Sequence, residues 1–259
     1  MSSATHADAV GAAPLLTLDR VSLTYGREPG VHALREVSLN VKSGEAVATI
    51  GRSGSGKSTL LNVLGLLDMA TEGDYRVAGT PVTKLPDHDR TLLRASFFGF
   101  VFQQSFLLAS RTAQENVEIP LRLRGVPRRE RQQRALAALT AVGLESRCGF
   151  LPRAMSGGEC QRVAIARAIA HKPQVLLCDE PTGNLDEHTA RDVLRLLFSA
   201  NQDGVTLIMV THDLAIARAF PRMVSVRDGR VSEGAESFLA AESLVTGIAS
   251  ALPTPVTER

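Results

Sequence analysis

The residues best suited to chemistry lie in a glycine-rich stretch, GRSGSGKST, at positions 51–59. Gly51, Gly56, Lys57 and Ser58 have the spacing of a phosphate-binding loop. Glycines let successive backbone amides converge on phosphate oxygens, while the lysine supplies positive charge and the serine can ligate Mg²⁺. The alternative is a flexible glycine–serine turn. The expected phosphate site is the whole stretch: Gly51, Arg52, Ser53, Gly54, Ser55, Gly56, Lys57, Ser58 and Thr59.

Two acidic residues end a buried-strand run, QVLLCDE, at positions 174–180. Asp179 is placed to hold the Mg²⁺ shell, and Glu180 could act as a base toward water. Taken alone, the same pattern would suit a strand exit with solvated carboxylates. His212 follows the next apolar run, at positions 205–210. We expect it at the same edge of a parallel sheet, where ligands usually bind.

A third stretch, SGGECQRVAIARA at positions 156–168, begins a predicted helix. Ser156 and Glu159 have the spacing of a capping box, in which each side chain bonds the backbone amide of the other. That pairing does not explain Gly157 and Gly158. Their missing side chains indicate that a large group approaches the positive end of the helix.

The elements that must position these residues predict an α/β fold. Apolar alternation at 15–26 and 34–51 is typical of half-buried strands in a β-rich opening, and 46–50 leads through the glycine loop into a helix at 57–67. A polar turn region is expected at 71–86. Strands and helices then alternate as in a parallel sheet. Expected are a strand at 97–102, helical structure at 113–142, a strand at 174–180, a helix at 186–201, a strand at 204–213 and a hairpin at 222–231 turning at Asp228-Gly229.

From Leu15 to about Gly234 the sequence resembles the ATP-binding domain of ABC transporters. MSGGE (155–159) is similar to that family's signature, FVFQQ (100–104) to its Q-loop, GNLD (183–186) to its D-loop and VTHD (210–213) to its switch histidine. The resemblance implies a P-loop NTPase core with a mainly parallel sheet, an N-terminal antiparallel β subdomain and a helical signature subdomain at about 105–168. We expect a mobile tail at 1–14, the ABC domain at 15–235, and a C-terminal helix and tail at 236–259.

Site roles follow from the same resemblance. Two copies would pair head to tail, so that the signature of one meets the γ-phosphate bound by the other. ATP and Mg²⁺ are the implied cofactors. For the nucleotide, the implied roles are adenine stacking by Tyr25 and γ-phosphate contacts by His212 and Lys57. For the metal and the attacking water, they are metal ligation by Ser58, Gln103 and Asp179, metal sensing by Gln103 with Gln104 as a rival, and water polarisation by Glu180. Between the two copies, Asp186 would form a cross-dimer link, and the signature contacts would come from Ser156, Gly157, Gly158 and Glu159. For Tyr25, an ordinary core aromatic is the alternative.

Composition narrows the partners. A net charge of +2 gives no general field for binding nucleic acid. An ATPase of this family that acts on nucleic acid or ribosomes is the weaker hypothesis, because the sequence shows neither two such domains in tandem nor a long coiled-coil or zinc-bearing insertion. No run reaches the roughly 18 apolar residues of a membrane span, so the resemblance implies a separate membrane permease with this chain on its cytoplasmic side. Three cysteines without metal-ligand spacing fit reduced thiols there.

A finer resemblance concerns the subgroup of the family. LGLLD (64–68), GFVFQ (99–103), ENVEIPL (115–121) and DEPTGNLD (179–186) resemble the lipoprotein-release and macrolide-exporter (LolD/MacB-type) subgroup. This implies an ATP-hydrolysing subunit that powers export of a lipophilic, peptide or lipoprotein cargo. The alternative is an ATPase that drives a cell-envelope mechanotransmission complex without cargo.

Overall fold

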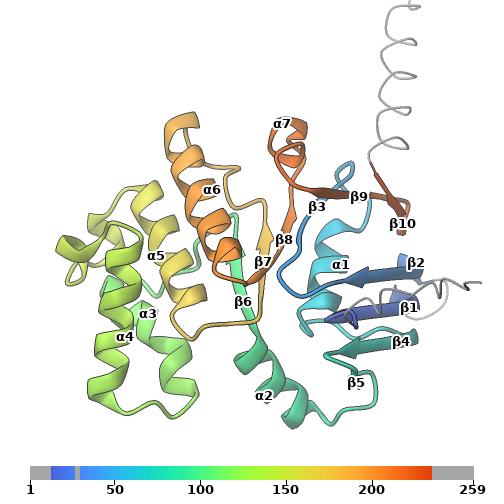
Figure 1. The fold of residues 1–259 in the computed structure, drawn as a ribbon, viewed down its shortest axis with the longest axis horizontal. Helices are drawn as coiled ribbons and strands as arrows, with labels where there is room; N and C mark the ends of the chain where they lie inside the picture. Colours follow the sequence, from blue (N-terminus) through green and yellow to red (C-terminus); the bar gives the residue numbers. More distant parts are fainter. Residues whose placement is uncertain (1–12, 27–29, 235–259) are drawn as a thin grey trace, which may run out of the picture.

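Two β-sheets, joined and flanked by helices, organise the chain (Figure 1). The computed structural model describes residues 13–26 and 30–234. The expected C-terminal helix and tail at 236–259 and most of the expected N-terminal tail lie outside these residues.

The first sheet is antiparallel and has the strand order β2-β1-β4-β5. It confirms the N-terminal antiparallel β subdomain. The expectation of polar turns at 71–86 is wrong, because this region supplies two of the strands. Only Tyr75 and Val77 of β4 are buried, and the charged residues around them hide the alternation. The strands are β1 Leu16–Tyr25, β2 Val31–Val41, β4 Glu72–Val77 and β5 Thr80–Pro81.

The second sheet has the order β10-β9-β3-β8-β7-β6, and all its neighbours are parallel except the β9–β10 hairpin. Its central strands are apolar along their length, as expected for strands covered on both faces. This sheet confirms the predicted α/β fold with a mainly parallel core. Its strands are β3 Ala46–Ile50, β6 Phe98–Phe102, β7 Val175–Asp179, β8 Thr206–Val210, β9 Arg222–Arg227 and β10 Arg230–Glu233.

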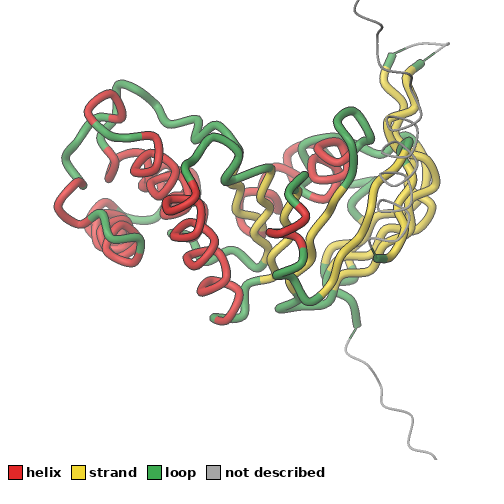
Figure 2. Tube along the Cα trace, turned by 90° about the horizontal axis from the view of Figure 1, so that it is seen from above, coloured by secondary structure: helices red, strands yellow, loops and turns green. Residues whose placement is uncertain are grey.

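Two hydrophobic cores flank the parallel sheet, one on each face. The first lies between the two sheets and contains α1, Lys57–Leu64. There the buried Tyr75 hydroxyl donates to the Leu64 carbonyl at 2.6 Å and ties the antiparallel sheet to the end of α1. The second core lies on the opposite face, under the helices that gather at one side of the molecule (Figure 2).

The remaining helices depart from the expected pattern in two places. The helical stretch expected at 113–142 is two helices, because Gly125 turns the chain out of α3 with φ +71° and Pro127 stands at the N-cap of α4. A further helix, α2, was not predicted. Helices α3, α4 and α5 pack together at one end of the molecule (Figure 1). The helices are α2 Asp87–Phe97, α3 Ala113–Leu123, α4 Arg128–Ala141, α5 Gly157–Ile169, α6 Glu187–Gln202 and α7 Leu214–Ala217, with 3-10 turns at Glu145–Arg147 and Pro152–Ala154.

Candidate active site

The glycine-rich loop connects β3 to α1, as the sequence predicts. Gly56 precedes α1 with φ +107°, and a β-carbon there would lie 2.6 Å from the Ala33 carbonyl. Only glycine therefore fits this position. No side chain of the described residues caps α1 at Gly56. The first amides of the helix are thus available to an anion.

Lys57 opens α1 and folds back over the loop. Its ammonium group donates to the carbonyls of Gly51 and Arg52, both at 2.9 Å. Burial lowers the pKa of Lys57, while the nearby carboxylates of Glu180 and Asp179 oppose that shift. The loop thereby fixes a positive charge beside the helix terminus.

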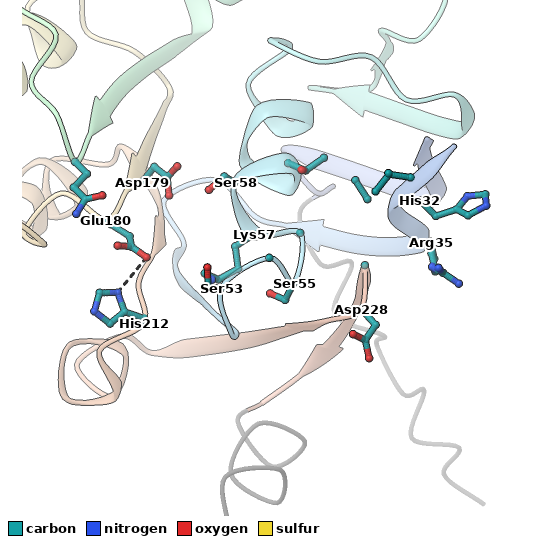
Figure 3. A pocket seen from close by; sticks show the side chains of 17 residues that line it. His32, Arg35, Ser53, Ser55, Lys57, Ser58, Asp179, Glu180, His212 and Asp228 are labelled. Carbon is teal, nitrogen blue, oxygen red and sulfur yellow. Dashed lines mark ion pairs between the residues drawn. The ribbon is translucent and has the colours of Figure 1, made fainter. Parts of the chain in front are cut away.

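Glu180 and His212 meet at the carboxyl edge of the parallel sheet. His212 Nδ1 lies 3.1 Å from Glu180 Oε1 (Figure 3). Glu180 has a left-handed backbone, φ +45°, and its amide donates to the Val210 carbonyl at 3.0 Å. Such strain persists where surrounding structure enforces it, which is common at functional sites. The two side chains expected at one sheet edge are therefore in contact.

Asp179 and Ser58 supply hard oxygen donors that suit Mg²⁺. Burial raises the pKa of Asp179, and a hydrogen bond from the Ser58 hydroxyl partly reverses the shift. The Ser58 hydroxyl oxygen and an Asp179 carboxylate oxygen therefore lie within hydrogen-bond reach of each other. No group of three or more His, Cys, Asp or Glu among the described residues could hold a metal alone. Mg²⁺ commonly takes only one or two protein oxygens and completes its shell with phosphates and water. These residues fit a nucleotide-linked Mg²⁺, with the Gln103 amide as a further donor.

A cavity of about 720 Å³ brings these groups together, a volume typical of small-molecule sites (Figure 3). Gln103 lines it, whereas Gln104 is not among its lining residues. The predicted site residues along its wall are Ser53, Gly54, Ser55, Gly56, Lys57, Ser58, Thr59, Gln103, Asp179, Glu180 and His212.

Part of the cavity wall comes from residues that the sequence did not single out as a site. Strand β2 contributes Val31 to Ala33 and Arg35, and the β9–β10 turn contributes Asp228 and Gly229. The Gly229 amide donates to the Ser55 carbonyl at 2.9 Å, and its carbonyl accepts from the Arg35 amide at 2.8 Å. The hairpin turn was recognisable in the sequence, but its contact with the loop depends on sheet topology.

Tyr25 lies outside that cavity wall. Its hydroxyl donates to Asp68 Oδ2 at 2.7 Å, and the side chain is 43% exposed. The hydrogen bonds around the hydroxyl also include Thr59, which does line the cavity. Stacking of the Tyr25 ring on adenine stays a prediction.

The signature residues 156–159 are not among those that line the cavity. The predicted capping box is confirmed: Glu159 N donates to Ser156 Oγ at 3.2 Å, and Ser156 N donates to Glu159 Oε2 at 2.8 Å. The two glycines differ. A β-carbon on Gly158 would lie 2.4 Å from Thr189 Cγ2, so contact within the chain explains this glycine. A β-carbon on Gly157 would meet no described atom within 4 Å beyond its chain neighbours and its own helix backbone, so the approach of an external group is still the prediction there.

Asp186 caps helix α6 and also lies outside the cavity wall. It accepts hydrogen bonds from the Thr189 amide at 3.0 Å and the Thr189 hydroxyl at 2.6 Å, and these bonds lower its pKa. Its side chain is exposed. A link across a dimer stays a prediction.

Comparison with known proteins decides the family. The ABC transporter family matches residues 34–183, more than half of the chain. The chain belongs to the ABC transporter family. The pyoverdine export ATP-binding/permease protein PvdT of Pseudomonas entomophila is 46% identical over 229 residues, which cover 87% of this chain and 35% of PvdT. The macrolide export ATP-binding/permease protein MacB of Escherichia coli K12 is 45% identical over 219 residues, 84% of this chain and 34% of MacB.

A solved structure supports the same assignment. The ABC cassette MJ0796, in a dimeric post-hydrolysis state bound to ADP and phosphate, superposes with a TM-score of 0.78 at 42% identity, covering 85% of this chain and 97% of that one. The chain is an ABC ATPase and binds ATP. It spans about a third of the length of the two export proteins. Within residues 13–26 and 30–234, no helix is long and apolar enough to span a bilayer.

Proposed function

We propose that this ABC ATPase powers an export system by closing with a second copy around two ATP molecules. One observation carries the proposal. A single cavity gathers the phosphate loop, Asp179, Glu180 and His212, yet its wall excludes the signature residues 156–159. A second copy, paired head to tail, would supply its signature to complete each site. The dimeric state of MJ0796 supports this arrangement.

The phosphate loop and Lys57 hold the triphosphate in this proposal. The α1 amides bind phosphate oxygens, and the Lys57 ammonium exchanges its two loop carbonyls for the β- and γ-phosphates. Ser58, Asp179 and Gln103 would hold Mg²⁺. When bound, the ion would neutralise charge that builds up on the transferred phosphoryl group.

Glu180 is the base that orients and deprotonates the attacking water. His212 fixes the position of its carboxylate through the 3.1 Å contact of Nδ1, and its second ring nitrogen would face the γ-phosphate. Because the strained Glu180 backbone is anchored to β8, the carboxylate keeps its direction between turnovers. Catalysis then depends on closure rather than on rebuilding the catalytic edge.

Closure also requires an exposed signature tip. Gly157 is exposed and a side chain there would meet no described atom, so its amide can approach a phosphate on the second copy. Tyr25 would stack on the adenine, and Asp186 would contact the second copy beside its capping role. ATP binding energy drives this closure, and hydrolysis reverses it.

The output of closure is work on a membrane permease at the inner face of the membrane. Its relatives are named for pyoverdine and macrolide export, so the proposed cargo is lipophilic, peptidic or lipoprotein-like. We expect the permease to be a separate membrane subunit. In the two relatives the printed names join ATP-binding and permease in one protein, and this chain matches about a third of their length.

The decisive experiment uses Glu180→Gln. With ATP and Mg²⁺, this variant should run as a dimer in gel filtration and retain two ATP per dimer, while the wild-type chain hydrolyses ATP and returns to monomer. Glu187→Gln, an exposed glutamate on α6, is the matched control. A Glu180→Gln variant that stays monomeric with ATP bound, or hydrolyses ATP at the wild-type rate, would refute the proposal.

A further inference from the structure

Gln161 is a buried polar residue of α5, five positions after the signature serine, and it has no place in the proposed chemistry. It is only 3% exposed. Its side-chain amide nitrogen donates to the Phe102 carbonyl and to the Pro181 carbonyl, both at 2.9 Å. Both amide hydrogens are therefore used on backbone oxygens of two different strand ends.

The geometry requires a two-hydrogen donor at this point. Carbonyl oxygens only accept, so the nitrogen of the Gln161 amide must face both of them. A carboxylate would repel both oxygens, and an aliphatic side chain would leave both buried without a partner. Among side chains of this length, glutamine alone satisfies the two acceptors.

The two acceptors lie at the catalytic end of neighbouring strands. Phe102 of β6 is paired with Asp179 of β7 in the last register position of the ladder. Beyond that pair the strands separate, and the Gln161 amide bridges them. Each accepting carbonyl belongs to a residue next to a site residue: Gln103 follows Phe102, and Glu180 precedes Pro181.

A second side chain of α5 holds the same segment farther on. Arg167 donates to the Ser105 and Phe106 carbonyls, both at 2.8 Å. Burial lowers the pKa of Arg167, consistent with a guanidinium enclosed by the segment that it binds. The backbone from 102 to 106, with Gln103 inside it, is thus attached to α5 at both ends.

Gln103 in turn reaches the loop that leads to α6. Its side-chain nitrogen donates to Asn184 Oδ1 at 3.2 Å, and a β-carbon on Gly183 would lie 2.8 Å from that nitrogen. The hydrogen bond from Gln161 to Phe102, the Phe102–Gln103 peptide bond and the hydrogen bond from Gln103 to Asn184 therefore connect α5 to the residues just before Asp186.

We propose that Gln161 is a positioning residue that ties the signature helix to the two backbone segments that carry Gln103 and Glu180. The inference rests on the proposed function, because it assigns the signature tip to a second copy's phosphate. When that tip engages, the Gln161 amide transmits its displacement to both strand ends at once. A chain with Gln161 replaced would still bind ATP, since the phosphate loop lies on β3 and α1, but it would hydrolyse ATP slowly.

The test compares Gln161→Leu with Val163→Ala, a substitution at a fully buried α5 residue outside this hydrogen-bond chain. Both variants remove buried interactions from α5, so melting temperatures are measured first and assays are run at equal distance below each. For Gln161→Leu we expect kcat to fall about tenfold or more, since small displacements of catalytic groups cost rate steeply, with the Kd for ATP changed less than about twofold. Val163→Ala should keep the wild-type kcat.

Gln161→Glu provides an independent readout if the leucine variant does not fold. A carboxylate cannot donate to either carbonyl, whereas its protonated form can donate to one. We expect the kcat of this variant, relative to wild type, to rise as the pH is lowered, and the ratio for Val163→Ala to stay flat. A flat ratio for Gln161→Glu would overturn the inference.

Failure of the inference is distinguishable from failure of the proposed function. If wild-type chain hydrolyses ATP and Glu180→Gln forms an ATP-dependent dimer, but Gln161→Leu matches Val163→Ala in kcat, only the role of Gln161 is refuted. If wild type does not hydrolyse ATP and no dimer forms, the proposed function fails, and the inference fails with it.

Discussion

Gly158 packs against Thr189: a β-carbon on the glycine would lie 2.4 Å from the threonine Cγ2 methyl group. The first turn of α5 is therefore pressed onto the first turn of α6, where Thr189 also donates to Asp186. This contact between α5 and α6 therefore holds the signature residues next to Asp186, the residue expected to link a dimer. A β-carbon on Gly157, one residue earlier, would meet no described atom within 4 Å beyond its chain neighbours and its own helix backbone.

Substitution should affect a different property at each glycine, and at Gly158 it should affect the stability of the fold. Gly158→Ala should lower the free energy of unfolding by about 1–3 kcal/mol, the usual cost of overpacking. Thr189→Ser removes the clashing methyl group but keeps the hydroxyl that binds Asp186, so it should restore most of the loss. Urea denaturation of the two single variants and the double variant measures this coupling. Additive losses would contradict the predicted clash.

Gly157 is expected to matter for pairing and not for folding. Gly157→Val should change the free energy of unfolding by no more than about 0.5 kcal/mol, as for exposed sites. In a Glu180→Gln background it should abolish the ATP-dependent dimer, because the valine side chain would occupy the space of the phosphate. Arg129→Val on the exposed side of α4 is the control and should leave the dimer intact. Gel filtration with ATP distinguishes the two, and an intact dimer with Gly157→Val would remove the signature from the interface.

Lys57 should contribute most to nucleotide affinity. Lys57→Ala removes a charge-assisted hydrogen-bond donor worth about 1.5–3 kcal/mol, which corresponds to a loss of roughly ten- to hundredfold in affinity for ATP. Isothermal titration calorimetry measures the Kd, with the exposed Lys84→Ala as a charge-matched control. Equal Kd values for the two variants would show that Lys57 does not contact phosphate.

The capping box should make stability depend on pH. The Ser156 amide, with help from Arg147, lowers the pKa of Glu159 below its ordinary value of 4.5. A lowered folded-state pKa gives stability that is complete above the unfolded-state pKa and is lost as pH falls through the folded-state value. The difference in unfolding free energy between wild type and Glu159→Gln should therefore shrink as pH falls from about 6 to about 3. A difference that stays constant over this range would exclude the ionised cap.

Local spacing predicted the chemistry better than it predicted the walls around it. The Lys57 loop, the Ser156–Glu159 box and the apolar β7 and β8 runs each carry their signal within a few residues. Strand β4 was missed because its buried face is only Tyr75 and Val77 among charged neighbours. The cavity wall from β2 and the β9–β10 turn follows from strand order, which no local pattern encodes.

Gly158 shows a different limit. Its need for glycine arises from Thr189, a residue on another helix, so the sequence suggested an external ligand for both glycines. The hydrogen bonds of Gln161 could not be predicted for the same reason. Its partners are backbone carbonyls, which every residue has, so the residue types at these positions do not indicate the contact.

The hydrogen bond from the Gly229 amide to the Ser55 carbonyl also has a consequence for folding during synthesis. Domains begin to fold while the ribosome is still adding residues, starting from the N-terminus. The glycine loop is synthesised early, but Gly229, whose amide binds the Ser55 carbonyl, lies beyond the family-matched region 34–183. A nascent chain thus contains the full glycine-rich motif before the residue that hydrogen-bonds the Ser55 carbonyl has been synthesised. A chain truncated between the two would keep the motif but lack this hydrogen bond.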